Sequence, residues 1–122
     1  MIKGINMYFK RNEPYRYTFS KPVDGRLTKT ETDDTVTTNV QILDVSNHGA
    51  KIYCPSVVNL QEHAKISLTF ELNSTFFQSP GTIVWLKQFR QSLELGLHLD
   101  TDDEYKEKIL AELKQMAKNK TQ

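Results

Sequence analysis

Two stretches in the second half of the sequence alternate apolar and polar residues with a period of two. One is ISLTFEL at residues 66–72, and the other is LELGLHL at residues 93–99. Successive side chains of a β-strand point to opposite faces, so this period predicts two strands with one apolar face each. A chain built from such strands must pack those apolar faces together around a shared core.

Further short segments rich in β-branched and aromatic residues extend this pattern along the chain. They lie at residues 15–19, 26–31, 36–45, 50–54 and 82–86. Turn-forming residues at 21–25 and 32–35 separate the first three, and Pro80-Gly81 precedes the segment at 82–86. Six or seven short strands at hairpin spacing predict a mainly β fold, namely a six- to seven-stranded antiparallel β-barrel.

The last part of the chain has the pattern of an amphipathic helix. Residues 101–104, TDDE, fit a capping box with acidic residues in the first turn. Tyr105, Ile109 and Leu113 then recur at helical spacing. We expect a C-terminal helix at 101–118 whose apolar stripe covers a barrel mouth or a partner. The predicted organisation is one domain over 1–122, with an N-terminal arm at 1–16 and a barrel at 17–100.

Charge and composition exclude several classes of function. The 122 residues carry a net charge of +1, so no strong overall field attracts nucleic acid or an anionic membrane. The first residues lack the apolar stretch of a signal peptide, and no run reaches the length of a membrane span. These features predict a soluble, cytoplasmic protein without membrane insertion.

Several reactive or aromatic residues have ordinary structural interpretations. Cys54 falls at an inward strand position, which favours a buried, inert thiol. The three histidines have no metal-ligand spacing, and no serine–histidine–acid set is visible, so we expect neither a metal or cofactor nor an enzyme. Trp85 is expected in the core, and His48 as an exposed turn residue. Phe76 and Phe77 are consistent with either a barrel corner or an oligomer contact.

The residues 40–54 contain the most informative motif. Two apolar runs flank the sequence DVSNHG at 44–49, which predicts two strands joined by a tight connection. Asp44 and Ser46 are able to hydrogen-bond the local backbone, and Gly49 suits a positive φ or a close approach of a ligand. The segment is therefore either a stable hairpin turn or a site that presents a carboxylate and a hydroxyl together.

The spacing D-x-S-x-x-G in this turn resembles the signature of the PilZ family, small β-barrel domains that bind the bacterial second messenger cyclic di-GMP. The segment KRNEPYR at 10–16 corresponds to the R-x-x-x-R arm of that family. If Arg16 is the second arginine of the pattern, the first falls on Asn12, and Arg11 lies one residue earlier. Either Arg11 substitutes for the missing arginine, or the site is weakened.

The resemblance implies a cyclic di-GMP receptor in which the arm rearranges on binding and engages a downstream protein. Guanine offers N7 and O6 to an arginine fork and N1 and N2 hydrogens to a carboxylate. Arg11 and Arg16 suit the first task, Asp44 the second, and Ser46 a phosphate or base edge, with Gly49 in the same turn. A barrel without ligand that acts as an interaction module is the alternative. A single-stranded nucleic-acid binder is disfavoured, and we expect a monomer or weak homodimer.

Overall fold

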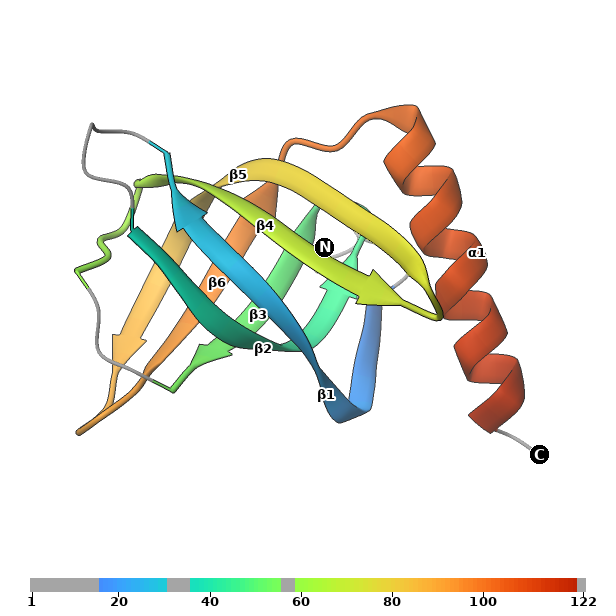
Figure 1. Ribbon diagram of the computed structural model, residues 1–122, viewed down its shortest axis with the longest axis horizontal. Helices are drawn as coiled ribbons and strands as arrows, with labels where there is room; N and C mark the ends of the chain where they lie inside the picture. Colours follow the sequence, from blue (N-terminus) through green and yellow to red (C-terminus); the bar gives the residue numbers. More distant parts are fainter. Residues whose placement is uncertain (1–15, 31–35, 56–58, 121–122) are drawn as a thin grey trace, which may run out of the picture.

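The protein folds into a closed antiparallel β-barrel with a helix against one end (Figure 1). The structure, a computed structural model, describes residues 16–30, 36–55 and 59–120. Around the barrel the strand order is β1-β2-β3-β6-β5-β4, and β1 closes on β4. The elements are β1 (Arg16–Lys29), β2 (Val36–Ser46), β3 (Gly49–Cys54), β4 (Lys65–Leu72), β5 (Thr75–Gln88), β6 (Leu93–Leu99) and α1 (Asp103–Lys120). The predicted fold class is confirmed, with six strands.

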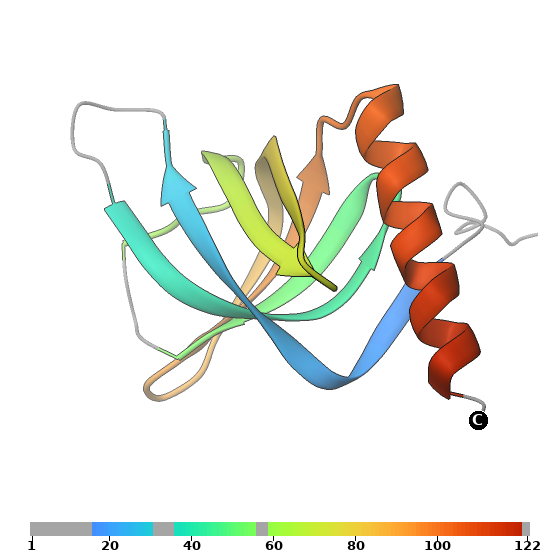
Figure 2. The same ribbon diagram turned by 45° about the vertical axis from the view of Figure 1, so that its right-hand side comes forward.

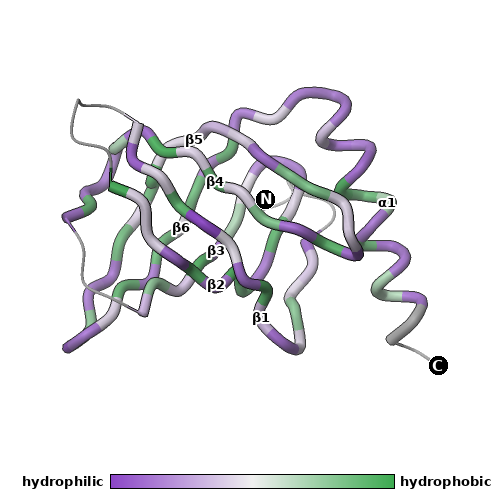
Figure 3. The backbone as a smooth tube through the Cα atoms, in the orientation of Figure 1, coloured by the Kyte–Doolittle hydropathy of each residue, from purple (hydrophilic) through white to green (hydrophobic). Residues whose placement is uncertain are grey.

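The alternating segments form strands whose apolar residues fill the barrel. In β4 and β6 every second side chain is buried, as the period of two predicts. Figure 3 shows the same alternation of apolar and polar residues along the tube. Cys54 also points into this core and is fully buried, as expected. The barrel interior is therefore a continuous hydrophobic core rather than a ligand cavity.

Two strands are longer than the sequence indicated. The predicted turn at 21–25 is wrong, because β1 runs through it with a register shift between Thr18 and Val23, and Figure 2 shows the sharp bend there. Pro80-Gly81 also does not end a strand, since both residues lie within β5. Pairing with β6 starts only at Gly81, so the missing N–H of Pro80 costs no ladder bond to β6.

The adjacent residues Phe76 and Phe77 have opposite surroundings on β5. Phe77 is 2% exposed and packs against Phe70 and Tyr105, with ring centroids 5.1 and 5.4 Å away. Phe76 points outward and is 59% exposed. The pair therefore belongs to a strand rather than to a barrel corner, and only Phe77 contributes to the core.

Helix α1 covers one mouth of the barrel beside the β4–β5 turn (Figure 1). Its apolar stripe of Tyr105, Ile109 and Leu113 is buried in the common core, as the helical spacing predicted. The helix starts later than expected, because Asp102 is the N-cap and accepts a hydrogen bond from the Tyr105 N–H at 2.8 Å. Glu112 accepts hydrogen bonds from Asn73 in the β4–β5 turn and from Thr75 at the start of β5, each at 2.9 Å. No helix in the described part of the chain is both long and apolar enough to cross a membrane.

Candidate functional site

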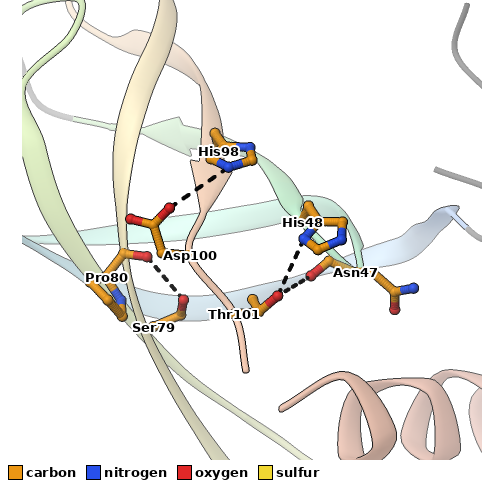
Figure 4. A network of polar contacts seen from close by, with 7 residues as sticks. All are labelled: Asn47, His48, Ser79, Pro80, His98, Asp100 and Thr101. Atoms are coloured by element: carbon orange, nitrogen blue, oxygen red, sulfur yellow. Dashed lines mark hydrogen bonds and ion pairs between the residues drawn. The ribbon is translucent and has the colours of Figure 1, made fainter. Parts of the chain in front are cut away.

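The β2–β3 turn is held in place by the connection between β6 and α1. β2 ends at Ser46 and β3 begins at Gly49, so Asn47 and His48 form the turn. The Thr101 hydroxyl donates to the Asn47 carbonyl at 2.9 Å, and the Leu99 N–H donates to the His48 carbonyl at 2.8 Å. Figure 4 shows Thr101 between the turn and the start of the helix. Thr101 thus supports the turn and does not cap α1.

Arg16 and Asp44 form an ion pair across β1 and β2. Arg16 lies opposite Ser46 in the antiparallel register, and its Nη2 is 2.9 Å from Asp44 Oδ1. The Asp44 side chain is only 12% exposed, whereas that of Arg16 is 47% exposed. The contact is ionic, since no described group makes a well-aligned hydrogen bond to Oδ1. A buried carboxylate is therefore balanced by an arginine whose guanidinium is still accessible from outside.

The other sequence-predicted site residues have different positions. Gly49 is the first residue of β3, and it lines a groove on the outer face of the barrel together with Arg16. Ser46 is fully buried and is not among the residues that line the groove. Arg11 and Asn12 lie outside the described residues. The structure thus places Arg16 in an ion pair with Asp44 and in one groove with Gly49, whereas Ser46 is buried opposite Arg16 in the β1–β2 ladder.

A groove of about 250 Å³ runs over the outer face of β3, β6 and β5. Trp85 on β5 is paired with Gly96 on β6, and its indole lies so close to Gly96 that a Cβ there would overlap the ring. Trp85 is 37% exposed, so its predicted core position is wrong. The groove is lined by Arg16, His48, Gly49, Ala50, Lys51, Val84, Trp85, Gly96, Leu97 and His98.

Sequence reasoning missed two features of this groove. The exposure of Trp85 was not predicted, because its strand segment is apolar. The only signal for it in the sequence is Gly96, which leaves space for the indole ring on the neighbouring strand. His48 lines the groove rather than a bare turn, and it lies beside His98. The described residues contain no group of three or more His, Cys, Asp or Glu that is placed to hold a metal ion. The groove thus presents cations, imidazoles and an aromatic ring together.

Comparison with known proteins finds one matching family and similar solved structures. A family model described as "PilZ domain" matches residues 9–115. The PilZ domain of YcgR from Escherichia coli, solved with c-di-GMP, is similar with a TM-score of 0.71 and 14% identity, over 93% of this chain and 98% of that one. A structure of YcgR from Escherichia coli in complex with c-di-GMP has a TM-score of 0.64 and 16% identity, over 92% of this chain but only 49% of that one. A comparison with curated protein sequences finds no match.

Proposed function

The chain belongs to the PilZ domain family, and we propose that it is a receptor domain for cyclic di-GMP. The observation that carries this proposal is the ion pair of Arg16 and Asp44 at the edge of an open, cation-lined groove. The two similar structures are both described as containing c-di-GMP. We propose that the domain acts in the cytoplasm as a sensor of this nucleotide and not as an enzyme.

The groove supplies the chemistry that a guanine dinucleotide needs. The accessible guanidinium of Arg16 is suited to the N7 and O6 acceptors of a guanine or to a phosphate. Asp44 is suited to the N1 and N2 donors of a base. Trp85 offers a partly exposed ring on which a base can stack, which is worth about 1–3 kcal/mol in nucleic-acid complexes. Lys51 adds a second cation for the phosphates.

We assign the remaining wall of the site to the N-terminal arm at 1–16, which contains Arg11. The groove of about 250 Å³ is smaller than the 300–1,000 Å³ typical of ligand sites. An arm that folds over the bound nucleotide would enclose it and supply a further arginine fork. Because the ligand would order the arm, the new position of the arm is the proposed signal to a downstream protein. The domain itself is proposed to be a monomer or weak homodimer.

The second candidate function is a barrel that does not bind the nucleotide and acts as an interaction module. The observation that favours it is Asn12, which stands where the R-x-x-x-R register requires the first arginine. One lost charge-assisted contact weakens binding by about 1.5–3 kcal/mol, or tenfold or more. Only a direct binding measurement separates a weakened receptor from a module without ligand.

The decisive experiment is a calorimetric titration of the full chain with cyclic di-GMP and, separately, with GMP. We expect selective binding of cyclic di-GMP and a loss of about 1–3 kcal/mol for Asp44→Ala, because guanine donors lose their acceptor. Arg16→Ala should weaken binding similarly. Asp24→Ala, an exposed acid on β1 outside the groove, is the matched control and should bind as the wild type does. Absence of heat with wild-type protein would favour the interaction module.

Ser46→Ala separates a direct role in binding from a supporting one, since Ser46 is fully buried opposite Arg16 in the β1–β2 ladder. If the hydroxyl binds the nucleotide after the arm moves, affinity falls while the free energy of unfolding of the free protein changes little. If Ser46 only supports the turn, stability falls and affinity of the folded protein is retained.

The arm is tested by two substitutions. Asn12→Arg should raise affinity up to about tenfold by restoring the family register, which is the scale of one charge-assisted contact. Arg11→Ala should abolish most binding if Arg11 already replaces the missing arginine, and should have little effect otherwise. Hydrogen exchange across residues 10–16 should slow on addition of nucleotide. Unchanged exchange, with no response to Asn12→Arg, would remove the arm from the mechanism.

A further inference from the structure

Two histidines meet at the groove from separate elements. His48 lies in the β2–β3 turn and His98 lies on β6, where it follows Leu97 and pairs with Gly49 across the strands. Their rings are nearly parallel, at 15°, and their centroids are 6.3 Å apart. Both side chains line the groove that contains Arg16. The fold therefore places two titratable imidazoles where the ligand is proposed to bind.

A hydrogen-bond relay defines the proton position on His48. The Thr101 hydroxyl has one hydrogen, which it donates to the Asn47 carbonyl at 2.9 Å. Its oxygen can therefore only accept from His48, whose Nδ1 lies 3.4 Å away (Figure 4). Nδ1 then carries the hydrogen in the neutral ring, and Nε2 is the atom that gains a proton when the ring becomes charged.

His98 lies near one carboxylate in an exposed position. Its Nε2 is 3.7 Å from Asp100 Oδ1, which is too long for a hydrogen bond but allows an ionic attraction. Both side chains are more than half exposed, so water screens this pair strongly. His98 therefore keeps an accessible ring that is free to respond to a bound anion.

The charged groups around the histidine pair suit an anionic ligand. The groove also contains Arg16 and Lys51, and two protonated rings beside them would repel each other and these cations. Arg16, Lys51 and His98 each have one nearby carboxylate, whereas His48 contacts the neutral hydroxyl of Thr101. Three sets of charged groups surround the histidine pair. Arg16 on β1 is 2.9 Å from Asp44 on β2, and Lys51 on β3 is 4.0 Å from Glu94 on β6. Asp100 follows β6 and lies near His98.

We propose that His48 and His98 form a phosphate subsite that binds the cyclic dinucleotide as imidazolium groups, so that affinity rises as pH falls. This inference rests on the proposed function, since the ligand supplies two phosphodiester anions. Phosphate anions bound beside the two rings favour the imidazolium form in the complex. Protons are therefore taken up on binding, and by linkage a lower pH favours the complex. The fraction of the domain with bound nucleotide would then depend on both pH and nucleotide concentration.

The test is calorimetric titration with cyclic di-GMP at pH 8, 7 and 6, in two buffers of different ionisation enthalpy at each pH. We expect affinity roughly tenfold higher at pH 6 than at pH 8, because linkage converts proton uptake by the two rings into a gain in affinity of this size. The buffer dependence of the heat counts the protons taken up. The phosphodiesters and bases of the ligand do not change protonation in this range, so the protons must go to the protein.

Three variants locate the effect. His48→Gln and His98→Gln each reduce the rise in affinity at low pH, and the double variant removes it together with the proton uptake. His63→Asn is the control, because His63 lies before β4, does not line the groove and has a positive φ of 73° that asparagine tolerates. This variant should keep the full pH response. Circular dichroism and thermal unfolding at each pH verify that all variants remain folded.

The outcomes separate this inference from the function on which it rests. Binding with equal affinity at all three pH values, or a pH response that persists in the folded double variant, overturns the histidine subsite alone. Absence of binding at every pH overturns the receptor function and the subsite with it. Should the variants unfold, the histidine NMR signals of the wild type decide, since the subsite requires two rings to become more protonated when nucleotide is added at constant pH.

Discussion

The barrel mouth under α1 and the outer groove are built from opposite faces of the same strands. On β5, Phe77 points inward to the helix, and Trp85 further along lies on the outside in the groove. On β6, Leu99 is fully buried while its neighbour His98 is exposed. On β6 this follows from the alternation of successive side chains, whereas on β5 the register shift between Ile83 and Trp85 turns Trp85 outward, although it has the same parity as Phe77. The two surfaces thus share a backbone but differ in chemistry.

This difference separates stability from recognition. The mouth is closed by aromatic and aliphatic contacts, which Glu112 reinforces with its two hydrogen bonds from Asn73 and Thr75. The groove contributes few buried apolar contacts and instead carries charges, imidazoles and one indole. A change at the mouth should therefore alter the free energy of unfolding, and a change in the groove should alter mainly ligand affinity.

The strongest test of this separation is Phe77→Ala. We expect a loss of about 3–5 kcal/mol in the free energy of unfolding, because a fully buried ring leaves a cavity between Phe70 and Tyr105. Denaturant unfolding monitored by circular dichroism measures it. Phe76→Ala is the matched control on the same strand and should cost less than about 1 kcal/mol, since that ring is outside the core. Equal losses would mean that the helix does not seal the mouth.

A smaller effect is expected for Gly96→Ala, which changes the groove from within the barrel wall. The added methyl overlaps the Trp85 ring, so the indole must move, at a cost of about 1–3 kcal/mol in stability. Trp85 is the only tryptophan, so a shift of its fluorescence emission reports the displacement directly. Binding of cyclic di-GMP should weaken as well.

The control for this variant is Gly25→Ala, where a Cβ would lie 2.9 Å from the Thr69 carbonyl oxygen on the other side of the barrel. It should also destabilise the protein but leave the tryptophan emission unchanged. The assignment of Trp85 to the groove is wrong if Gly96→Ala leaves both emission and affinity at wild-type values.

The smallest effect is expected for Tyr105→Phe at the mouth. The Tyr105 hydroxyl is buried without a hydrogen-bond partner among the described residues, so its removal should change stability at neutral pH by less than about 1 kcal/mol. Burial raises the pKa of Tyr105 above its usual value near 10. The neutral form is therefore favoured by folding, and this contribution is complete below pH 10 and is lost as pH rises further.

Unfolding measured from pH 8 to 11 checks this expectation. The wild type should lose more stability above pH 10 than Tyr105→Phe does, whereas Tyr53→Phe, a partly exposed residue on β3, should behave as the wild type. Parallel curves for wild type and Tyr105→Phe would contradict the buried, unpaired hydroxyl.

The local patterns predicted much of the fold because they record which side of each element faces the core. The alternations at 66–72 and 93–99 became β4 and β6, and the stripe of Tyr105, Ile109 and Leu113 became the buried face of α1. The tight connection within 44–49 was predicted from its polar residues and glycine, although β2 continues to Ser46 and only Asn47 and His48 form the turn. Arg16 and Asp44 were expected to act together. The strands, the helix and the turn depend only on neighbours in sequence, whereas the joint role of Arg16 and Asp44 was expected from the family resemblance.

Pairing between distant strands determined the rest. Residues 21–25 and Pro80-Gly81 have turn chemistry, yet they lie within β1 and β5, because neighbouring strands supply hydrogen bonds that override local preference. The register of β5 on β6 places Trp85 over Gly96, and that of β3 on β6 brings His98 beside the His48 turn. By itself the sequence determined the strands, the helix and the polar turn. Only closure of the barrel decided which side chains share the groove, since a sequence does not contain the register between strands.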